Sequence, residues 1–259
     1  MANAKQTTEV RVPIQETFTL PSRGLPYNGA IPDQVTMRAM TTLDEKIRLS
    51  TNGLNSIVAL INSCTIAPEE FEASNLKMFD IQYLLYMLRA ITYGSDYPVS
   101  VYCDHCDKYV DVTINLDELA VTELDDNYTE PFDVGPLPVS KDMLQCKIVS
   151  IGEMIEIEKE SKRILNKFRD YVGDPEFILS YKYMVHSING NVLPDFKKQA
   201  YIENMNAKDL RYLDVVYDKK ANGYGVNTVI ETECPICGAP LVFNMPVNDE
   251  FFRPKFDFW

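Results

Sequence analysis

Two Cys-x-x-Cys pairs constrain the fold of this 259-residue chain more than any other feature. This spacing brings two sulfurs to one side of a tight turn, where backbone N–H groups can stabilise their charge. Structural zinc sites take four such ligands in a tetrahedron, so one pair supplies half of a site and two pairs complete it. The two pairs stand far apart, with 127 residues between the second cysteine and the third. The sequence nevertheless predicts one structural Zn²⁺ ion held by Cys103, Cys106, Cys234 and Cys237.

The residues around each pair are typical of β-hairpins. Residues 97–102 and 109–114 flank the first pair and are rich in β-branched and aromatic side chains. Residues 228–232 and 241–243 flank the second pair in the same way. Each pair is therefore expected at the tip of a hairpin, and one ion would join hairpins from opposite ends of the chain.

Other chemistries remain open for these cysteines, namely two reduced dithiols or redox-active pairs. A redox pair usually lies at a helix N-terminus in a βαβ setting, and neither pair has that context. His105 lies inside the first turn and could replace a cysteine as a ligand. Four thiolates would close the coordination shell to water and substrate, which favours a structural ion. Cys64 and Cys146 stand alone on apolar segments and are expected to be buried.

The net charge of −13 bears on the choice of partner, because proteins that bind nucleic acid usually need a basic face. The composition therefore disfavours DNA and RNA and favours protein partners. No stretch of about 18 apolar residues is present, which predicts no membrane span. Residues 1–9 lack an apolar signal core. We expect the protein in a cytosol, where thiols stay reduced and paired cysteines bind metals.

Catalytic motifs are missing from the sequence. It contains no Gly-rich phosphate loop, no His-Glu-x-x-His and no Gly-x-Ser-x-Gly. Of the two histidines, one lies in the first cysteine turn and His186 is expected on a helix face. Adjacent acids such as Asp125 and Asp126 are usually solvated in an acidic protein. The sequence predicts no enzymatic activity.

The remaining pattern predicts an α+β fold, mainly helical, with a small zinc-centred β unit of zinc-ribbon-like hairpins. Helical spacing of apolar residues is expected over 79–93, 151–168, 176–187 and 207–217. The peptide Asp-Ile-Gln-Tyr-Leu at 80–84 precedes the first cysteine pair. Asp-Leu-Arg-Tyr-Leu at 209–213 precedes the second at nearly the same distance. We interpret the match as an internal duplication; the alternative is chance similarity between amphipathic helices. The expected parts are an extended N-terminal arm (1–32), a first half with a zinc hairpin (33–118), a second half with a zinc hairpin (119–247) and an aromatic C-terminal tail (248–259).

Two segments are candidates for partner binding. The segment from residue 20 to 27 is rich in turns and apolar side chains, and the C-terminus places aromatics beside arginine, which is typical of interface anchors. The alternative for each segment is that it folds back over the chain's own core. The candidate residues are Leu20, Pro21, Arg23, Tyr27, Phe251, Phe252, Phe256, Phe258 and Trp259.

Several of these motifs occur together in one known family. Leu-Pro-Ser-Arg-Gly-Leu-Pro-Tyr at 20–27 is followed by Val-Thr-Met-Arg-Ala-Met-Thr-Thr-Leu-Asp-Glu at 35–45. Leu88-Arg89 and Thr92-Tyr93-Gly94 then lead into the first Cys-x-x-Cys hairpin. This chain resembles the baseplate hub and hub assembly proteins of T-even-like contractile-tailed bacteriophages. The resemblance is good over residues 18–120 and loose elsewhere.

The resemblance implies a structural or assembly role in the baseplate hub, where the tail tube and the tape measure start. The implied partners are other phage tail and baseplate hub proteins, the tape-measure protein and further copies of this chain. The implied location is the host cytoplasm during assembly and then the virion tail.

Three alternatives are kept. The first is an assembly chaperone for a hub or tape-measure protein, absent from the mature virion. The second is a zinc-ribbon nucleic-acid-binding or transcription factor, which conflicts with the negative charge. The third is a metalloenzyme, which would need an open coordination position.

Overall fold

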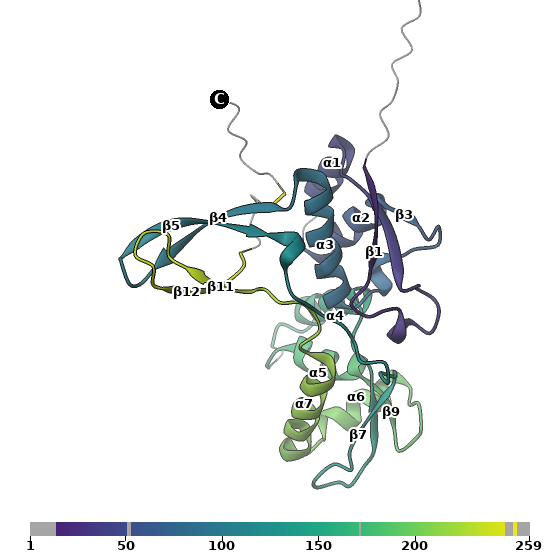
Figure 1. Ribbon diagram of the computed structural model, residues 1–259. Coiled ribbons are helices and arrows are strands. Elements are labelled where there is room, and N and C mark those ends of the chain that lie inside the picture. The colour runs from purple at the N-terminus through teal and green to yellow at the C-terminus, as the bar shows by residue number, and fades with distance from the viewer. Residues whose placement is uncertain (1–13, 51–52, 171, 247–250, 253–259) are drawn as a thin grey trace, which may run out of the picture.

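The computed structural model describes residues 14–50, 53–170, 172–246 and 251–252. Within these ranges the fold is α+β, as predicted, with seven α-helices and several small antiparallel sheets (Figure 1). None of the described helices is both long and apolar enough to cross a membrane. The helices are α1 (Thr42–Ser50), α2 (Leu54–Cys64), α3 (Met78–Tyr93), α4 (Ile151–Lys167), α5 (Pro175–Met184), α6 (Asp195–Glu203) and α7 (Ala207–Ala221). The strands are β1 (Gln15–Thr19), β2 (Gln34–Arg38), β3 (Thr65–Ala67), β4 (Asp96–Cys103), β5 (Lys108–Asn115), β6 (Val121–Thr122), β7 (Phe132–Val134), β8 (Leu144–Cys146), β9 (Val185–Ile188), β10 (Gly225–Val226), β11 (Val229–Glu233) and β12 (Pro240–Asn244). Three short 3-10 helices are η1 (Leu25–Tyr27), η2 (Ala73–Asn75) and η3 (Leu116–Glu118).

The first sheet has the strand order β1-β2-β3 and packs against α3, and together they form the first apolar core of the molecule. Along β2, Val35 and Met37 are fully buried and alternate with more exposed neighbours, so one face of the strand is apolar. β1 lies inside the predicted arm (1–32) and pairs with β2 along its whole length. The described part of that arm is therefore a strand of the main body.

The second sheet has the order β7-β8-β9 and forms a separate apolar core with α7. Cys146 in this core and Cys64 in the first core are fully buried, as their apolar surroundings predict. The helix expected at 176–187 ends at Met184, because the next residues pair with β8 and form β9. His186 therefore lies on a strand, and its expected place on a helix face is wrong.

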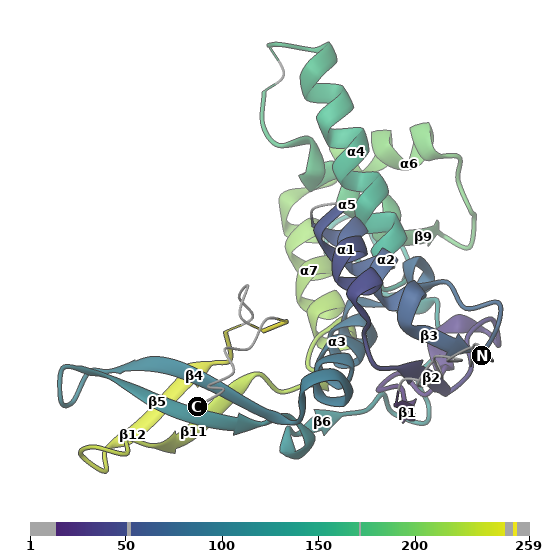
Figure 2. The same ribbon diagram turned by 90° about the horizontal axis from the view of Figure 1, so that it is seen from above.

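Two long hairpins, β4–β5 and β11–β12, project together from the helical body (Figures 1 and 2). Each hairpin is a two-stranded antiparallel sheet in which exposed residues alternate with buried or partly buried ones. Val110, Leu241 and Phe243 belong to one small apolar cluster between the hairpins. Segments from opposite ends of the chain thus lie side by side, and this contact brings the two cysteine turns together.

The N-terminus of α1 is held by Asp44, which is fully buried. Its carboxylate accepts hydrogen bonds from Arg38 Nη1 at 2.7 Å, the Thr41 N–H at 2.7 Å and the Ser63 hydroxyl at 2.6 Å. Burial acts to raise the pKa of Asp44, but the hydrogen bonds from Arg38, Ser63 and Thr41 outweigh it and hold the pKa well below its usual range. This carboxylate ties α1 to β2 and to α2.

Candidate metal centre

The four predicted cysteines meet at the tips of the two hairpins. Their sulfurs all lie within 4.8 Å of one another. The Cys103 Sγ–Cys237 Sγ distance is 3.8 Å and the Cys106 Sγ–Cys234 Sγ distance is 3.9 Å. Four sulfurs at zinc–sulfur bond length in a tetrahedron are about 3.8 Å apart, whereas a disulfide needs about 2.05 Å. The spacing fits a tetrahedral ion, and the donor set of four thiols fits zinc.

One side of the cluster is protected and the other is open. Cys103 and Cys234, each the first of its pair, are buried on the apolar residues between the hairpins. Cys106 is half-buried and Cys237 is exposed at the surface of the tip. A metal ion held here would lie at the outer end of the projecting unit, backed by a small apolar core.

Backbone geometry shapes the second turn as its sequence predicts. The Gly238 N–H donates to the Cys234 carbonyl oxygen at 2.9 Å, and the Cys234 N–H donates to the Ala239 carbonyl oxygen at 2.8 Å. Gly238 has a φ of +70°, in the left-handed region that glycine adopts without strain. In the first turn Asp107 takes the equivalent position with a φ of +54°. Aspartate tolerates this region better than most residues, so both turns close in the same way.

The electrostatics of the four sulfurs favours binding of a cation. The backbone N–H of Cys237, and then that of Ile236, lower the pKa of Cys234 to about 6. Burial, and then the neighbouring Cys103 sulfur, raise the pKa of Cys106 to about 12. Four sulfurs this close cannot all ionise without a compensating charge. A divalent cation supplies that charge, and it binds the thiolate form.

His105, the alternative ligand, does not belong to the cluster. The group of potential ligand atoms found among the described residues contains the four cysteines alone. His105 lies in the exposed part of the first turn, between the two cysteines. The structure therefore brings together the four residues that the cysteine spacing selects, and leaves the histidine outside.

The candidate partner residues near the N-terminus pack on the chain itself. Leu20, Pro21 and Tyr27 are buried in the first core or against it. The Tyr27 hydroxyl accepts a hydrogen bond from the Lys77 N–H at 2.9 Å and donates one to the buried carboxylate of Asp80. Burial raises the pKa of Asp80 to about 6, against the lowering effect of its hydrogen bonds. This network holds the segment on the N-terminus of α3.

Arg23 is the most exposed of these N-terminal candidates. Its guanidinium donates to the Leu124 carbonyl oxygen at 2.5 Å and pairs with Asp126 at 2.6 Å. Its Nε lies 3.6 Å from the Glu123 carboxylate. These contacts hold the segment from residue 20 to 27 against residues 123–126 of the same chain. The binding of a partner by Arg23 stays a prediction.

The C-terminal aromatics divide into two groups. Phe251 is fully buried, with ring centroids 5.1 Å from Tyr97 and 5.6 Å from Tyr86. Phe252 is also buried, and the Arg48 guanidinium lies 5.8 Å from its ring centroid. These two side chains fold back over the chain's own core. Phe256, Phe258 and Trp259 lie outside the described residues, and their binding of a partner stays a prediction.

Sequence reasoning missed the role of the buried aspartates. Asp80 and Asp209 are both buried in the first turn of a helix, and each accepts backbone hydrogen bonds from a preceding loop. The sequence does mark both positions, because Asp80 begins the peptide at 80–84 and Asp209 begins the matching peptide at 209–213. A buried acid at this helix position can satisfy N–H groups of a loop that packs on it.

The fold and the site define an α+β protein with a four-cysteine cluster able to bind a metal ion on two joined hairpins. The model of the family described as T4 bacteriophage base plate protein matches residues 14–253, so the chain belongs to this family. This confirms the resemblance to baseplate proteins of T4-like phages, and the match includes the second cysteine hairpin as well as the first. The comparisons with curated proteins and with solved structures give no match. Membership identifies a phage baseplate protein that interacts with other phage tail proteins.

Proposed function

We propose that this protein is a non-catalytic structural subunit of the baseplate hub, in which one Zn²⁺ ion joins hairpin β4–β5 to hairpin β11–β12. The observation that carries the proposal is the meeting of four sulfurs within 4.8 Å from turns separated by 127 residues. Four protein ligands leave no coordination position for water or substrate, so the ion would stabilise the fold without reacting.

The contacts between the hairpins explain why an ion is useful there. The apolar cluster between them is small, with Cys103, Val110, Cys234 and Leu241 as its buried members. Two-stranded hairpins are marginally stable alone. A metal cross-link at the tips removes loop-closure entropy from the unfolded chain and fixes the two hairpins in one orientation. A rigid projecting unit suits a protein that acts through contacts with neighbouring subunits.

The negative charge argues against binding of nucleic acid by the zinc unit, which is the pair of hairpins β4–β5 and β11–β12. Exposed side chains of the hairpins include Asp111, Glu231 and Glu233. These carboxylates would repel phosphate groups, and the net charge of the chain is −13. The acidic surface favours protein partners in the baseplate over DNA or RNA.

Two measurements test the proposal. Metal analysis of protein purified without added metal is expected to give one zinc per chain. Mass spectrometry of mature phage particles is expected to find the protein at a fixed stoichiometry, as a subunit requires. Purified protein without zinc would contradict the metal assignment, and absence from the particle would instead identify an assembly chaperone.

We also propose that the two halves arose by internal duplication. The order of elements supports this, because β1-β2-α1-α2-β3 in the first half corresponds to β7-β8-α4-α5-β9 in the second (Figure 1). In each half a three-stranded antiparallel sheet has its strands in sequence order, and a helix then leads towards a cysteine hairpin. The pairing of β2 with β3 contains a shift in register, and so does the corresponding pairing of β8 with β9.

The loop contacts of the two buried aspartates support the duplication independently. Asp80 accepts the Ser22 N–H at 3.0 Å, and Asp209 accepts the Val139 and Ser140 N–H groups at 2.6 and 2.9 Å. Both loops follow a Leu-Pro dipeptide, at 20–21 and 137–138. An experimental structure in which the halves have different strand orders would contradict the duplication.

A further inference from the structure

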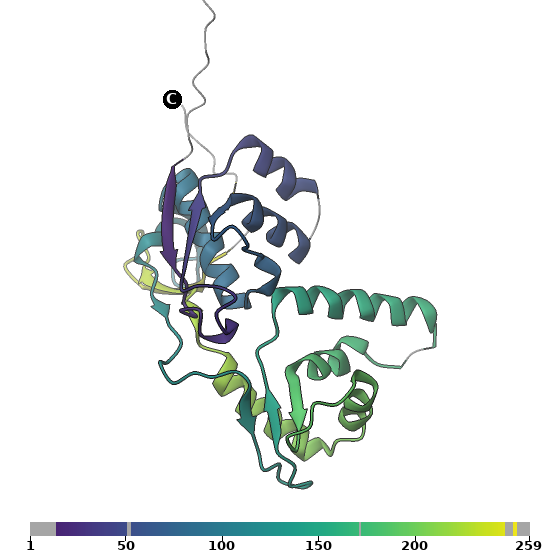
Figure 3. The same cartoon turned by 90° about the vertical axis from the view of Figure 1, so that its right-hand side faces the viewer.

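The hairpin of α4 and α5 ends in an exposed apolar surface, which we name the α4–α5 tip. Figures 2 and 3 show α4 extending away from the rest of the molecule. The side chains at its far end are between 46% and 94% exposed, although all four are large and hydrophobic. Large apolar side chains exposed at one end of a helical hairpin are candidates for an interaction site. The α4–α5 tip consists of Leu165, Phe168, Val172 and Phe177.

The α4–α5 tip is locally basic in an acidic protein. Residues 161–169 contain four basic residues and no acidic one, while the whole chain carries a net charge of −13. Lys162 and Arg163 pair with glutamates on their own helix. Lys167 and Arg169 form no ion pair with any residue in the part of the chain that the structure describes. Lys167 Nζ lies 5.2 Å from the centroid of the Phe168 ring, so charge and apolar surface are adjacent.

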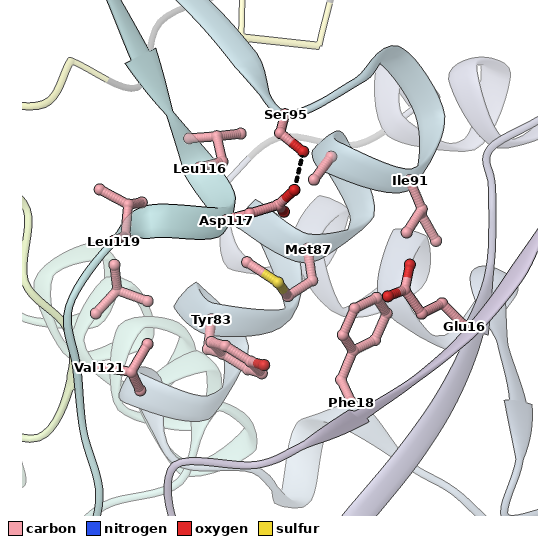
Figure 4. Close-up of a pocket in the computed structure, with 12 residues that line it drawn as sticks. Glu16, Phe18, Tyr83, Met87, Ile91, Ser95, Leu116, Asp117, Leu119 and Val121 are labelled. Atoms are coloured by element: carbon pink, nitrogen blue, oxygen red, sulfur yellow. Dashed lines mark hydrogen bonds between the residues drawn. The ribbon is translucent and has the colours of Figure 1, made fainter.

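A groove on the body has the complementary properties. Figure 4 shows this α3 groove, which lies between β1, one face of α3 and the segment from η3 to β6, with a volume of about 370 Å³. Its volume is within the range of pockets that enclose part of a ligand. The large apolar side chains that line it include those of Phe18, Tyr83, Met87, Ile91, Leu119 and Val121.

The charged groups of the α3 groove are acidic. Glu16 and Asp117 line it and are exposed, and no lysine or arginine is among its lining residues. Asp117 accepts a hydrogen bond from the Ser95 hydroxyl, and neither acid forms an ion pair within the described residues. Burial, and then the charges of Glu16 and Glu123, raise the pKa of Tyr83 in the groove. A partner with apolar side chains and positive charge would fit this surface.

We propose that the α4–α5 tip of one copy of the protein docks in the α3 groove of a second copy. Phe168 and its apolar neighbours would fill the groove, and Lys167 and Arg169 would lie against Glu16 and Asp117. The far end of α4 extends away from β1, α3 and β6, the elements that line the groove (Figures 2 and 3), so the tip of one copy does not reach its own groove. Such a contact is head-to-tail, and it generates a ring or an open filament.

The charge distribution favours a second copy as the occupant. A net charge of −13 makes most contacts between copies repulsive. The α4–α5 tip and the α3 groove are opposite in sign and both apolar, so this one orientation combines attraction with burial. The proposal uses no part of the zinc unit, so its failure would leave the proposed function untouched.

Sedimentation of the full-length protein over a range of concentrations tests the contact. The wild type is expected to associate, and association is expected to weaken as salt is added. A tip variant, Lys167→Glu/Arg169→Glu, and a groove variant, Glu16→Lys/Asp117→Lys, should each raise the Kd about tenfold or more, because like charges would then face each other. Lys219→Glu/Lys220→Glu on α7 is the matched control, with the same change in net charge as the tip variant at exposed positions elsewhere.

Mixing the two variants gives the decisive result. Each retains one intact surface only, so a one-to-one mixture is expected to add heterodimers in which two reversed surfaces meet, together with dimers joined through the two intact surfaces. The intact pair should associate with the wild-type Kd. The two reversed surfaces that remain are again opposite in charge, so the mixture should associate more strongly than either variant alone and can continue beyond dimers. A wild type that stays monomeric at every soluble concentration, variants that associate as the wild type does, or a mixture that stays monomeric would each overturn the proposal.

Discussion

The sulfurs of Cys103 and Cys237 lie 3.8 Å apart and join the first residue of one cysteine pair to the last residue of the other. This crossed arrangement, with Cys106 beside Cys234 at 3.9 Å, interleaves ligands from both hairpins. Neither hairpin holds more than half of the site. Loss of either pair therefore removes the cluster as a whole.

Replacement of Cys237 by serine is expected to abolish zinc binding and to lower the free energy of unfolding by about 2–5 kcal/mol, the range for loss of a native cross-link that closes a long loop. Metal analysis and denaturant unfolding measure the two effects. His105→Asn, inside the first turn but outside the cluster, is the control and should keep both zinc and stability. Equal stability of Cys237→Ser and the wild type would contradict a structural ion.

The hydroxyl of Tyr27 gives a second prediction. Tyr27→Phe removes the acceptor of the Lys77 N–H and a donor to the buried Asp80, so we expect a loss of about 1–3 kcal/mol of stability. Tyr109→Phe, at an exposed position on β5, is the matched control and should change stability little. Equal losses in both variants, measured by urea unfolding, would exclude a special role for the Tyr27 network.

Asp80 also predicts a dependence of stability on pH. Its folded pKa of about 6 lies above the value of an unfolded aspartate, so its proton favours the folded state. The stabilisation is complete below about pH 4 and is lost as the pH rises through 6, with a slope of at most about 1.4 kcal/mol per pH unit. Asp80→Asn should remove this slope between pH 4 and 7. An unchanged slope in the variant would assign the titration to another group.

Asp44 predicts the opposite behaviour in acid. The hydrogen bonds that lower its folded pKa stabilise the protein above about pH 4, where an unfolded aspartate is ionised. This contribution is lost as the pH falls below 4 and the folded carboxylate gains its proton. Asp44→Asn should be less stable at neutral pH by about 2 kcal/mol and should flatten the acid side of the stability curve. Thermal unfolding between pH 2 and 7 measures both.

The C-terminal aromatics predict two separable effects. Phe251→Ala should lower the free energy of unfolding by about 3–5 kcal/mol, because the side chain is fully buried among Tyr86 and Tyr97. Trp259→Ala is expected to leave stability unchanged and to weaken incorporation into baseplates. Unfolding measurements and an assembly assay distinguish the two roles. A Trp259 variant that assembles normally would argue against the tail as a partner-binding segment.

The metal cluster could be predicted because its signal is local. A Cys-x-x-Cys turn with alternating β-branched flanks specifies a hairpin and half of a metal site within about twenty residues. The buried place of Tyr27 could not be predicted in this way. It depends on Asp80 and Lys77, which are distant in sequence, and a turn-rich apolar segment has the same pattern whether it covers its own core or a neighbour.

The end of α5 shows a second limit of sequence reasoning. The apolar spacing of residues 176–187 suits a helix, but pairing with β8 turns Val185–Ile188 into a strand. Tertiary contacts therefore override the local period over a few residues. The short strands β3 and β7 escape prediction for a related reason, since three residues carry too little periodicity to be recognised.

The crossed cysteines also have a consequence for biosynthesis. Cys234 follows Cys106 by 128 positions. The first hairpin therefore leaves the ribosome with two of the four ligands, and the other two are synthesised seconds later at ordinary rates of translation. All four sulfurs can surround one ion only after the intervening helices and sheet have been made and have folded closely enough to bring the turns together. Binding of the proposed zinc ion would thus be a late event, and an occupied site would indicate that the middle of the chain has folded correctly.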